Sequence, residues 1–188
     1  MMEKVSHKDM LEAGVHFGHL KRKWNPKMLP YIFAERKGIH LIDLNKTSES
    51  LEDAAHAVRQ IVKSGRKVLF VATKKQAKEV VKTEAQRANM PYVTERWLGG
   101  MLTNFATIRR SVKKMESIRK LLDDKSTTSL TKKERLLLDR QLQKLSTVLG
   151  GIENLNRVPA AVYVVDITYE DIAIKEACLV YTSPSPRD

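Results

Sequence analysis

Two nearly continuous apolar runs, KVLFVAT at 67–73 and AAVYVVD at 160–166, most restrict the folds open to this chain. Each run has the length of a β-strand, and neither alternates apolar with polar residues. Strands with this pattern are buried on both faces, which is typical of parallel sheets covered by helices. A helical pattern follows each run, so the sequence predicts an α/β fold.

The remaining short elements fit the same fold. We expect strands at 39–43 and 91–95, a helix over 48–64, and a helix after the run at 67–73 that ends at about Ala88. In the first helix, apolar residues recur at three- and four-residue spacing, and Gly65 suits its C-terminal cap. Because parallel strands need long crossover connections, this alternation of strands and helices predicts a parallel sheet flanked by helices.

Two long helical patterns, 103–124 and 131–149, interrupt the α/β alternation. Apolar residues recur near heptad spacing in the first, and leucines recur in steps of four, three and four in the second. Two such helices joined by the short polar turn KSTTS predict an antiparallel coiled-coil hairpin. We therefore expect an α/β domain made of 1–102 and 150–177, with the hairpin inserted as 103–149.

The excess positive charge is concentrated in two segments. The chain has 34 basic and 22 acidic residues, a formal net charge of +12. Residues 21–37 hold six basic and one acidic residue, 103–150 hold twelve and five, and the rest is balanced. Such local excess indicates an acidic partner, either nucleic acid or an anionic membrane surface. The apolar face of the hairpin is used between its helices, and no apolar run could span a bilayer, so nucleic acid is favoured over a membrane.

The segment KRKWNPK at 21–27 combines charge with an aromatic ring. We expect its cations to meet phosphates and Trp24 to offer a flat surface to a base or ribose, while Asn25 and Pro26 fix a turn. The alternative is that Trp24 fills the core and the lysines are merely solvated. The candidate RNA-binding residues here are Lys21, Arg22, Lys23, Trp24, Asn25 and Lys27.

A second group of cations lies in RRSVKK on the first hairpin helix. Positions 109 and 113, like 110 and 114, are one turn apart, where like charges repel each other. An anionic partner explains that arrangement, and a solvated helix face is the alternative. The candidates are Arg109, Arg110, Lys113 and Lys114.

The segment RWLGGMLTN at 96–104 has two consecutive glycines. Such a pair permits backbone conformations that other residues resist, or the close approach of another backbone. Arg96 and Trp97 stand just before the glycines, and Asn104 can cap the first hairpin helix; a hinge for the hairpin is the structural alternative.

Enzymatic chemistry has little support. Lys74 and Lys75 follow a strand, but neither a dinucleotide-binding nor a P-loop glycine pattern accompanies them. His16 and His19 could approach one metal ion, yet no nearby residues complete a site. The single Cys178 excludes an internal disulfide and fits a reducing cytoplasm. We assign no catalytic residue, metal, cofactor or small-molecule substrate; a protein–protein adaptor acting through the basic hairpin is the alternative function.

Several motifs identify a resemblance to a known family. AGVHFGH, WNPKM, RWLGGMLTN, LTKKE, LGGI and DIAIKEA occur in order between about Val5 and Ala177. They resemble those of the bacterial ribosomal protein S-two family of the small ribosomal subunit. The resemblance implies an α/β fold of flavodoxin- or Rossmann-like topology and a non-catalytic, cytoplasmic rRNA-binding protein that supports late subunit assembly and translation. It also implies neighbouring ribosomal proteins as partners, including the mRNA-binding protein S-one, which the family helps to anchor. The resemblance places 96–104 against RNA, which makes Arg96, Trp97 and Asn104 candidate RNA-binding residues; a core position is the alternative for Trp97.

The resemblance ends near residue 177. The family continues with a further buried strand, whereas this chain has CLVYTSPSPRD. We therefore expect a truncated α/β domain and a disordered tail unrelated to the family over 178–188.

Overall fold

The computed structural model describes residues 5–123 and 131–181. They belong to two compact units, Met1–Gln60 and Ile61–Asp188, and the boundary falls within a helix. In the described part of the chain, no helix is both long and apolar enough to cross a bilayer. The expected turn KSTTS and residues 182–188 of the expected tail lie outside the described residues.

The first unit is built on a small antiparallel sheet. Its elements are α1 (His7–Glu12), β1 (Phe17–Leu20), η1 (Lys21–Lys23), η2 (Pro26–Tyr31), β2 (Ile32–Arg36), β3 (Ile39–Ile42) and α2 (Leu44–Lys63). The strand order is β1-β3-β2, with both pairings antiparallel. Lys37 and Gly38 both have positive φ, 53° and 73°, which fits the tight turn of a right-twisted hairpin between β2 and β3.

This sheet corrects the sequence prediction for the first unit. The strand expected at 39–43 exists as β3, but it pairs with β1 and β2 rather than joining a parallel sheet. The two partner strands were missed because they are short, mostly exposed and lack alternation of apolar and polar residues. Helix α2 also begins earlier than expected, since the Asp43 carboxylate accepts a hydrogen bond from the Asn45 N–H at 2.9 Å. Its C-terminal end agrees with the prediction, because Gly65 has φ 73°.

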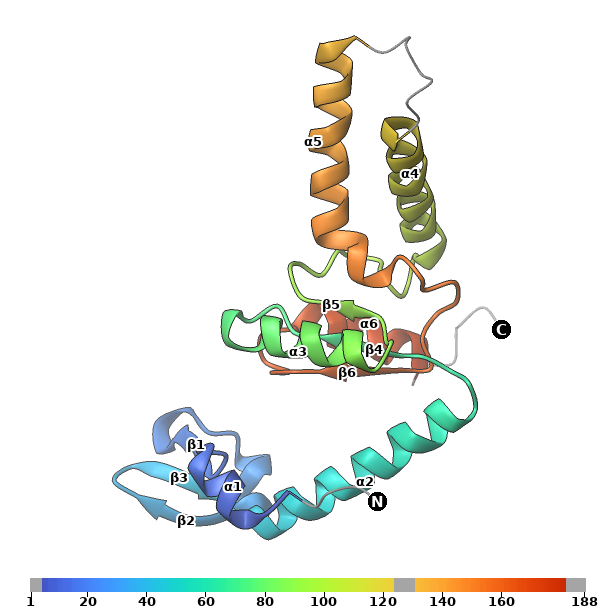
Figure 1. Cartoon of the computed structure of the whole chain (residues 1–188). Coiled ribbons are helices and arrows are strands. Elements are labelled where there is room, and N and C mark those ends of the chain that lie inside the picture. Colours follow the sequence, from blue (N-terminus) through green and yellow to red (C-terminus); the bar gives the residue numbers. More distant parts are fainter. Residues whose placement is uncertain (1–4, 124–130, 182–188) are drawn as a thin grey trace. The chain divides into compact units, whose positions relative to one another are not determined.

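The second unit contains the predicted parallel sheet flanked by helices (Figure 1). Its elements are β4 (Val68–Val71), α3 (Lys75–Arg87), β5 (Tyr92–Val93), α4 (Phe105–Asp123), α5 (Lys132–Leu149), η3 (Gly150–Ile152), β6 (Ala161–Val164) and α6 (Asp171–Tyr181). The strand order is β5-β4-β6, and both pairings are parallel. The central strand β4 lies within the run KVLFVAT, and its Val68, Leu69 and Val71 are buried as the pattern predicts. The run AAVYVVD forms β6 at an edge of the sheet, where its residues are only partly buried and Tyr163 is 43% exposed, so the prediction that this strand is buried on both faces is wrong.

Both long helices exist and share the core of the sheet. Ile108, Val112 and Met115 of α4 are buried in the same cluster as Leu69 and Val93 of the strands. Leu142, Leu145 and Leu149 of α5 pack against this cluster or belong to it. The apolar spacing that predicts the two helices therefore also selects the faces that they bury.

One glycine position and one helix end add to what the sequence predicts. A Cβ at Gly151 would stand 2.1 Å from the Tyr92 carbonyl oxygen, so this glycine permits η3 to lie against β5. Helix α6 continues to Tyr181, whose hydroxyl donates to the Pro159 carbonyl at 2.7 Å. Residues 178–181 are thus helical and not part of an unstructured tail.

Candidate nucleic-acid interface

The loop at 96–104 is held by one buried carboxylate, Glu176 of α6, which is 7% exposed. Its Oε1 accepts hydrogen bonds from the Trp97 indole N–H at 3.0 Å and from the Gly100 N–H at 2.7 Å. Its Oε2 accepts from the Leu102 N–H at 3.0 Å and from the N–H and hydroxyl of Thr103, both at 3.2 Å. Five donors from one loop thus converge on a single side chain, which fixes the shape of the loop.

These hydrogen bonds keep Glu176 ionised. Burial by itself favours the neutral acid and raises its pKa. The hydrogen bonds from the Trp97 indole and from the main chain of the loop outweigh burial, so the pKa of Glu176 lies below its usual value. The negative charge of Glu176 is compensated by these internal donors, so it does not make the outer surface of the loop acidic.

Sequence reasoning missed Glu176, although a signal was present. In DIAIKEA, Ala173 and Glu176 are three residues apart and lie on the same, buried face of α6. A glutamate on the apolar face of a helix requires partners, because an unpaired buried carboxylate is costly. That placement points to an internal hydrogen-bonding role.

The structure separates the three candidates of this loop. Arg96 and Asn104 are exposed, whereas Trp97 is 7% exposed and belongs to the core cluster. Because its ring is packed and its N–H is bound to Glu176, Trp97 has no open face for a base. For Trp97 the core alternative is therefore the one that the geometry supports.

The four candidate cations of α4 fall into two groups, one hydrogen-bonded within the protein and three exposed. The Arg109 guanidinium donates to the Glu153 carbonyl and to the Asn156 side-chain oxygen, each at 2.9 Å, and so joins α4 to the segment after η3. Arg110, Lys113 and Lys114 are exposed, and none has an ion-pair partner among the described residues. Three of the four candidates thus present positive charge to solvent.

In the first unit, the segment 21–27 is held by few contacts. The Lys21 ammonium lies 2.9 Å from a Glu35 carboxylate oxygen on the surface. The Asn25 side chain accepts from the Lys27 N–H at 3.0 Å, as a turn requires. Trp24 is half-buried, with its ring 4.9 Å from the buried ring of His40. The other three cations, Arg22, Lys23 and Lys27, are exposed.

The usual ligand position of a parallel sheet is occupied by the chain itself. Ligands of such sheets bind outside the carboxyl ends of the strands, where the strand order reverses, here between β4 and β6. At that edge the Lys74 ammonium lies 2.7 Å from an Asp166 oxygen, and Glu170 accepts two hydrogen bonds from Thr73 at 2.6 Å. The hydrogen bond from Lys74, with a second from the Thr168 hydroxyl, lowers the pKa of Asp166 to about 2. Lys74 is thus engaged within the protein.

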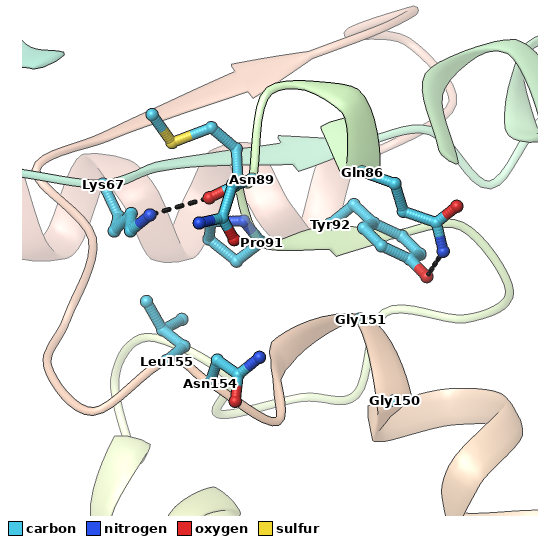
Figure 2. Close-up of a pocket in the computed structure, with 10 residues that line it drawn as sticks. Lys67, Gln86, Asn89, Pro91, Tyr92, Gly150, Gly151, Asn154 and Leu155 are labelled. Carbon is cyan, nitrogen blue, oxygen red and sulfur yellow. Dashed lines mark hydrogen bonds between the residues drawn. The ribbon is translucent and has the colours of Figure 1, made fainter. Parts of the chain in front are cut away.

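A pocket of about 250 Å³ lies elsewhere in the second unit, between the start of β5 and η3 (Figure 2). Its polar groups bind one another: Lys67 donates to the Asn89 carbonyl at 2.7 Å, and Gln86 donates to the Tyr92 hydroxyl at 2.9 Å. Among the described residues, no three metal-ligating side chains gather, at His16 and His19 or elsewhere.

Comparison with known proteins identifies the family of the chain. A family model described as "Ribosomal protein S2" matches residues 10–181. The chain therefore belongs to the ribosomal protein S2 family, as its motifs predict.

Three similar relatives are each named small ribosomal subunit protein uS2. That of Cytophaga hutchinsonii is 65% identical over 177 residues, which are 94% of this chain and 70% of the relative. That of Flavobacterium johnsoniae is 55% identical, and the match covers 100% of this chain and 77% of the relative. That of Bacteroides thetaiotaomicron is 58% identical, and the match covers 94% of this chain and 63% of the relative. The chain thus spans roughly two-thirds to three-quarters of these relatives, whose names describe ribosomal proteins and no enzyme.

Proposed function

We propose that this chain is a structural constituent of the small ribosomal subunit that binds small-subunit rRNA in the bacterial cytoplasm. Family membership supports the subunit, and the observation that carries the RNA contact is the row of exposed cations on α4. Arg110, Lys113 and Lys114 stand there without an acidic partner among the described residues. Like charges held this close favour an anionic ligand, and phosphate is the anion that rRNA supplies.

The other basic segment and the loop at 96–104 supply further proposed RNA contacts. In the first unit, Arg22, Lys23 and Lys27 provide charge, and the uncovered part of the Trp24 ring provides a stacking surface. In the second unit, Arg96 and Asn104 project from the loop that Glu176 holds. Arg109, Lys21 and Asn25 act indirectly, since each is engaged in a contact within the chain.

Three finer features of the proposal rest on the family resemblance. The helices α4 and α5 form the antiparallel coiled-coil hairpin 103–149, which carries the basic row away from the α/β domain. The sheet has the flavodoxin- or Rossmann-like topology of the family. The protein supports late subunit assembly and helps to anchor the mRNA-binding protein S-one.

The test is sedimentation of the tagged chain from a bacterial lysate, at low and moderate salt, with and without RNase. We expect the chain to migrate with the small subunit at moderate salt and to leave it after RNase treatment. The triple variant Arg110→Glu, Lys113→Glu and Lys114→Glu should move to the top of the gradient. A double variant at Arg59 and Lys63 of α2, changed in the same way, is the control for a general effect of charge.

Two outcomes would contradict the proposal. Migration near the top of the gradient by the unsubstituted, folded chain would exclude the ribosomal role. Association that survives RNase would favour the protein–protein adaptor instead.

A further inference from the structure

The two glycines of the loop 96–104 have different structural requirements. Gly100 has φ 88°, and a Cβ there would lie 3.1 Å from the Cβ of Asn104. An L-residue is strained at that φ, so the conformation of the loop itself requires glycine at position 100.

Gly99 has neither requirement. Its φ lies outside the left-handed region, and none of the described atoms lies within 4 Å of the point where a Cβ would stand. It is also exposed. Among the eight glycines of the chain, only Gly150 is similar, with one ordinary contact of 3.7 Å. The folded chain by itself would therefore accept a side chain at position 99.

The surroundings of Gly99 favour an anion. No acidic residue occurs in 96–104, and Arg96 is exposed without an ion-pair partner among the described residues. Of the nearby acids, Glu176 is buried beneath the loop, and Glu95 binds Lys78 at 3.0 Å. The loop thus exposes main chain at Gly99, carries no acidic side chain, and has the unneutralised cation of Arg96 three residues away.

The Glu176 anchor makes this surface rigid. The N–H groups of Gly100, Leu102 and Thr103 all donate to its carboxylate, while Gly99 itself is exposed. Binding of a partner to this preformed loop costs little ordering entropy. Because Gly99 has no side chain, the partner can approach the main chain at this residue closely.

We propose that Gly99 is the point where the sugar–phosphate backbone of rRNA lies in van der Waals contact with the protein main chain. In this contact Arg96 neutralises the adjacent phosphate. The inference rests on the proposed rRNA-binding function and adds a specificity-determining residue to it: a side chain at position 99 is excluded by the RNA and not by the fold.

The experiment compares the full 188-residue chain with Gly99→Ala and Gly99→Leu, in binding to a small-subunit rRNA transcript at fixed salt. Overpacking a close contact costs about 1–3 kcal/mol, or about 5- to 150-fold in affinity, so we expect Ala near the lower limit and Leu near the upper one. Because no charge changes, the slope of affinity against salt should stay constant. Thermal unfolding of both variants should match that of the unsubstituted chain.

Matched glycine variants complete the design. Gly150→Ala should change neither unfolding nor RNA affinity, whereas Gly100→Ala should lower the unfolding temperature. Equal RNA affinity of Gly99→Leu and the unsubstituted chain would overturn the inference and leave the proposed function intact. Unfolding of Gly99→Leu would overturn its premise. Normal RNA binding with failure to join the subunit would assign the contact to a protein, which also overturns it. Failure of the unsubstituted chain to bind rRNA would instead remove the proposed function.

Discussion

The loops at 21–27 and 96–104 are both candidate RNA contacts, yet they are built in opposite ways. The first carries four cations and is held by a surface ion pair, one turn hydrogen bond, a main-chain hydrogen bond from Lys21 to the Gly38 carbonyl and the packing of Trp24 on His40. The second carries one cation and is held by five hydrogen bonds to a buried carboxylate. The difference indicates that the first acts through charge and the second through a fixed shape.

The largest expected effect distinguishes the two tryptophans. Trp97→Ala empties a packed site and frees the Glu176 carboxylate, so it should lower the free energy of unfolding by about 4 kcal/mol. Trp24→Ala should cost only about 1 kcal/mol, because the ring is half-exposed, but should weaken RNA binding about tenfold through lost stacking. Urea unfolding and RNA titration of both variants measure this. An equally large loss of stability in Trp24→Ala would make Trp24 a core residue and remove the contrast.

The next effect concerns the anchor of the second loop. Glu176→Gln keeps one acceptor oxygen but turns an amide N–H₂ toward N–H donors, so we expect a loss of about 2 kcal/mol of unfolding free energy. Amide exchange at Gly100, Leu102 and Thr103 should accelerate. The matched control is Asp171→Asn on the exposed face of the same helix, where an ion pair to Lys175 is worth about 0.5 kcal/mol or less. Unchanged amide exchange in Glu176→Gln would show that the loop is rigid without its anchor.

A smaller effect is expected from removal of charge. Substitution of Arg22, Lys23 and Lys27 by Ala should reduce the salt dependence of RNA binding by about two to three units of slope, since each phosphate contact contributes about 0.7–0.9. Arg96→Ala should reduce the slope of this salt dependence by the contribution of about one phosphate contact. Neither change should affect unfolding by more than about 0.5 kcal/mol. The contrast fails if both variants lose the same slope.

The smallest effect is the acid dependence of stability. Because the pKa of Glu176 is lowered in the folded state, its stabilisation is fully present above its ordinary value of about 4.5 and is lost as pH falls below that value. Glu176→Gln should lack this part of the pH profile. Asp166, with a pKa of about 2 against an ordinary 3.8, gives a second loss at lower pH that the variant retains. Unfolding followed by Trp97 fluorescence in a Trp24→Phe background measures both.

Much of the second unit was predictable because its patterns report burial directly. KVLFVAT and AAVYVVD both form strands of the parallel sheet, as their apolar runs predict, although of these two only the central strand β4 is buried. The spacing in α4 and α5 selects one buried face on each helix. The antiparallel sheet of the first unit was not predictable in this way. Its strands are short and exposed, and their pairing depends on a turn at Lys37 and Gly38 rather than on an apolar pattern.

The candidate interface shows the same division. The sequence by itself determined where the positive charge lies, which family the motifs resemble and that a glycine pair needs an explanation. Only the tertiary structure decided that Trp97 and Arg109 face inward, that Glu176 anchors the loop, and that Gly100 serves the backbone while Gly99 stays open. The physical reason is that charge and hydropathy belong to single residues, whereas hydrogen-bond partners and free space arise from residues more than 70 positions apart brought together by folding.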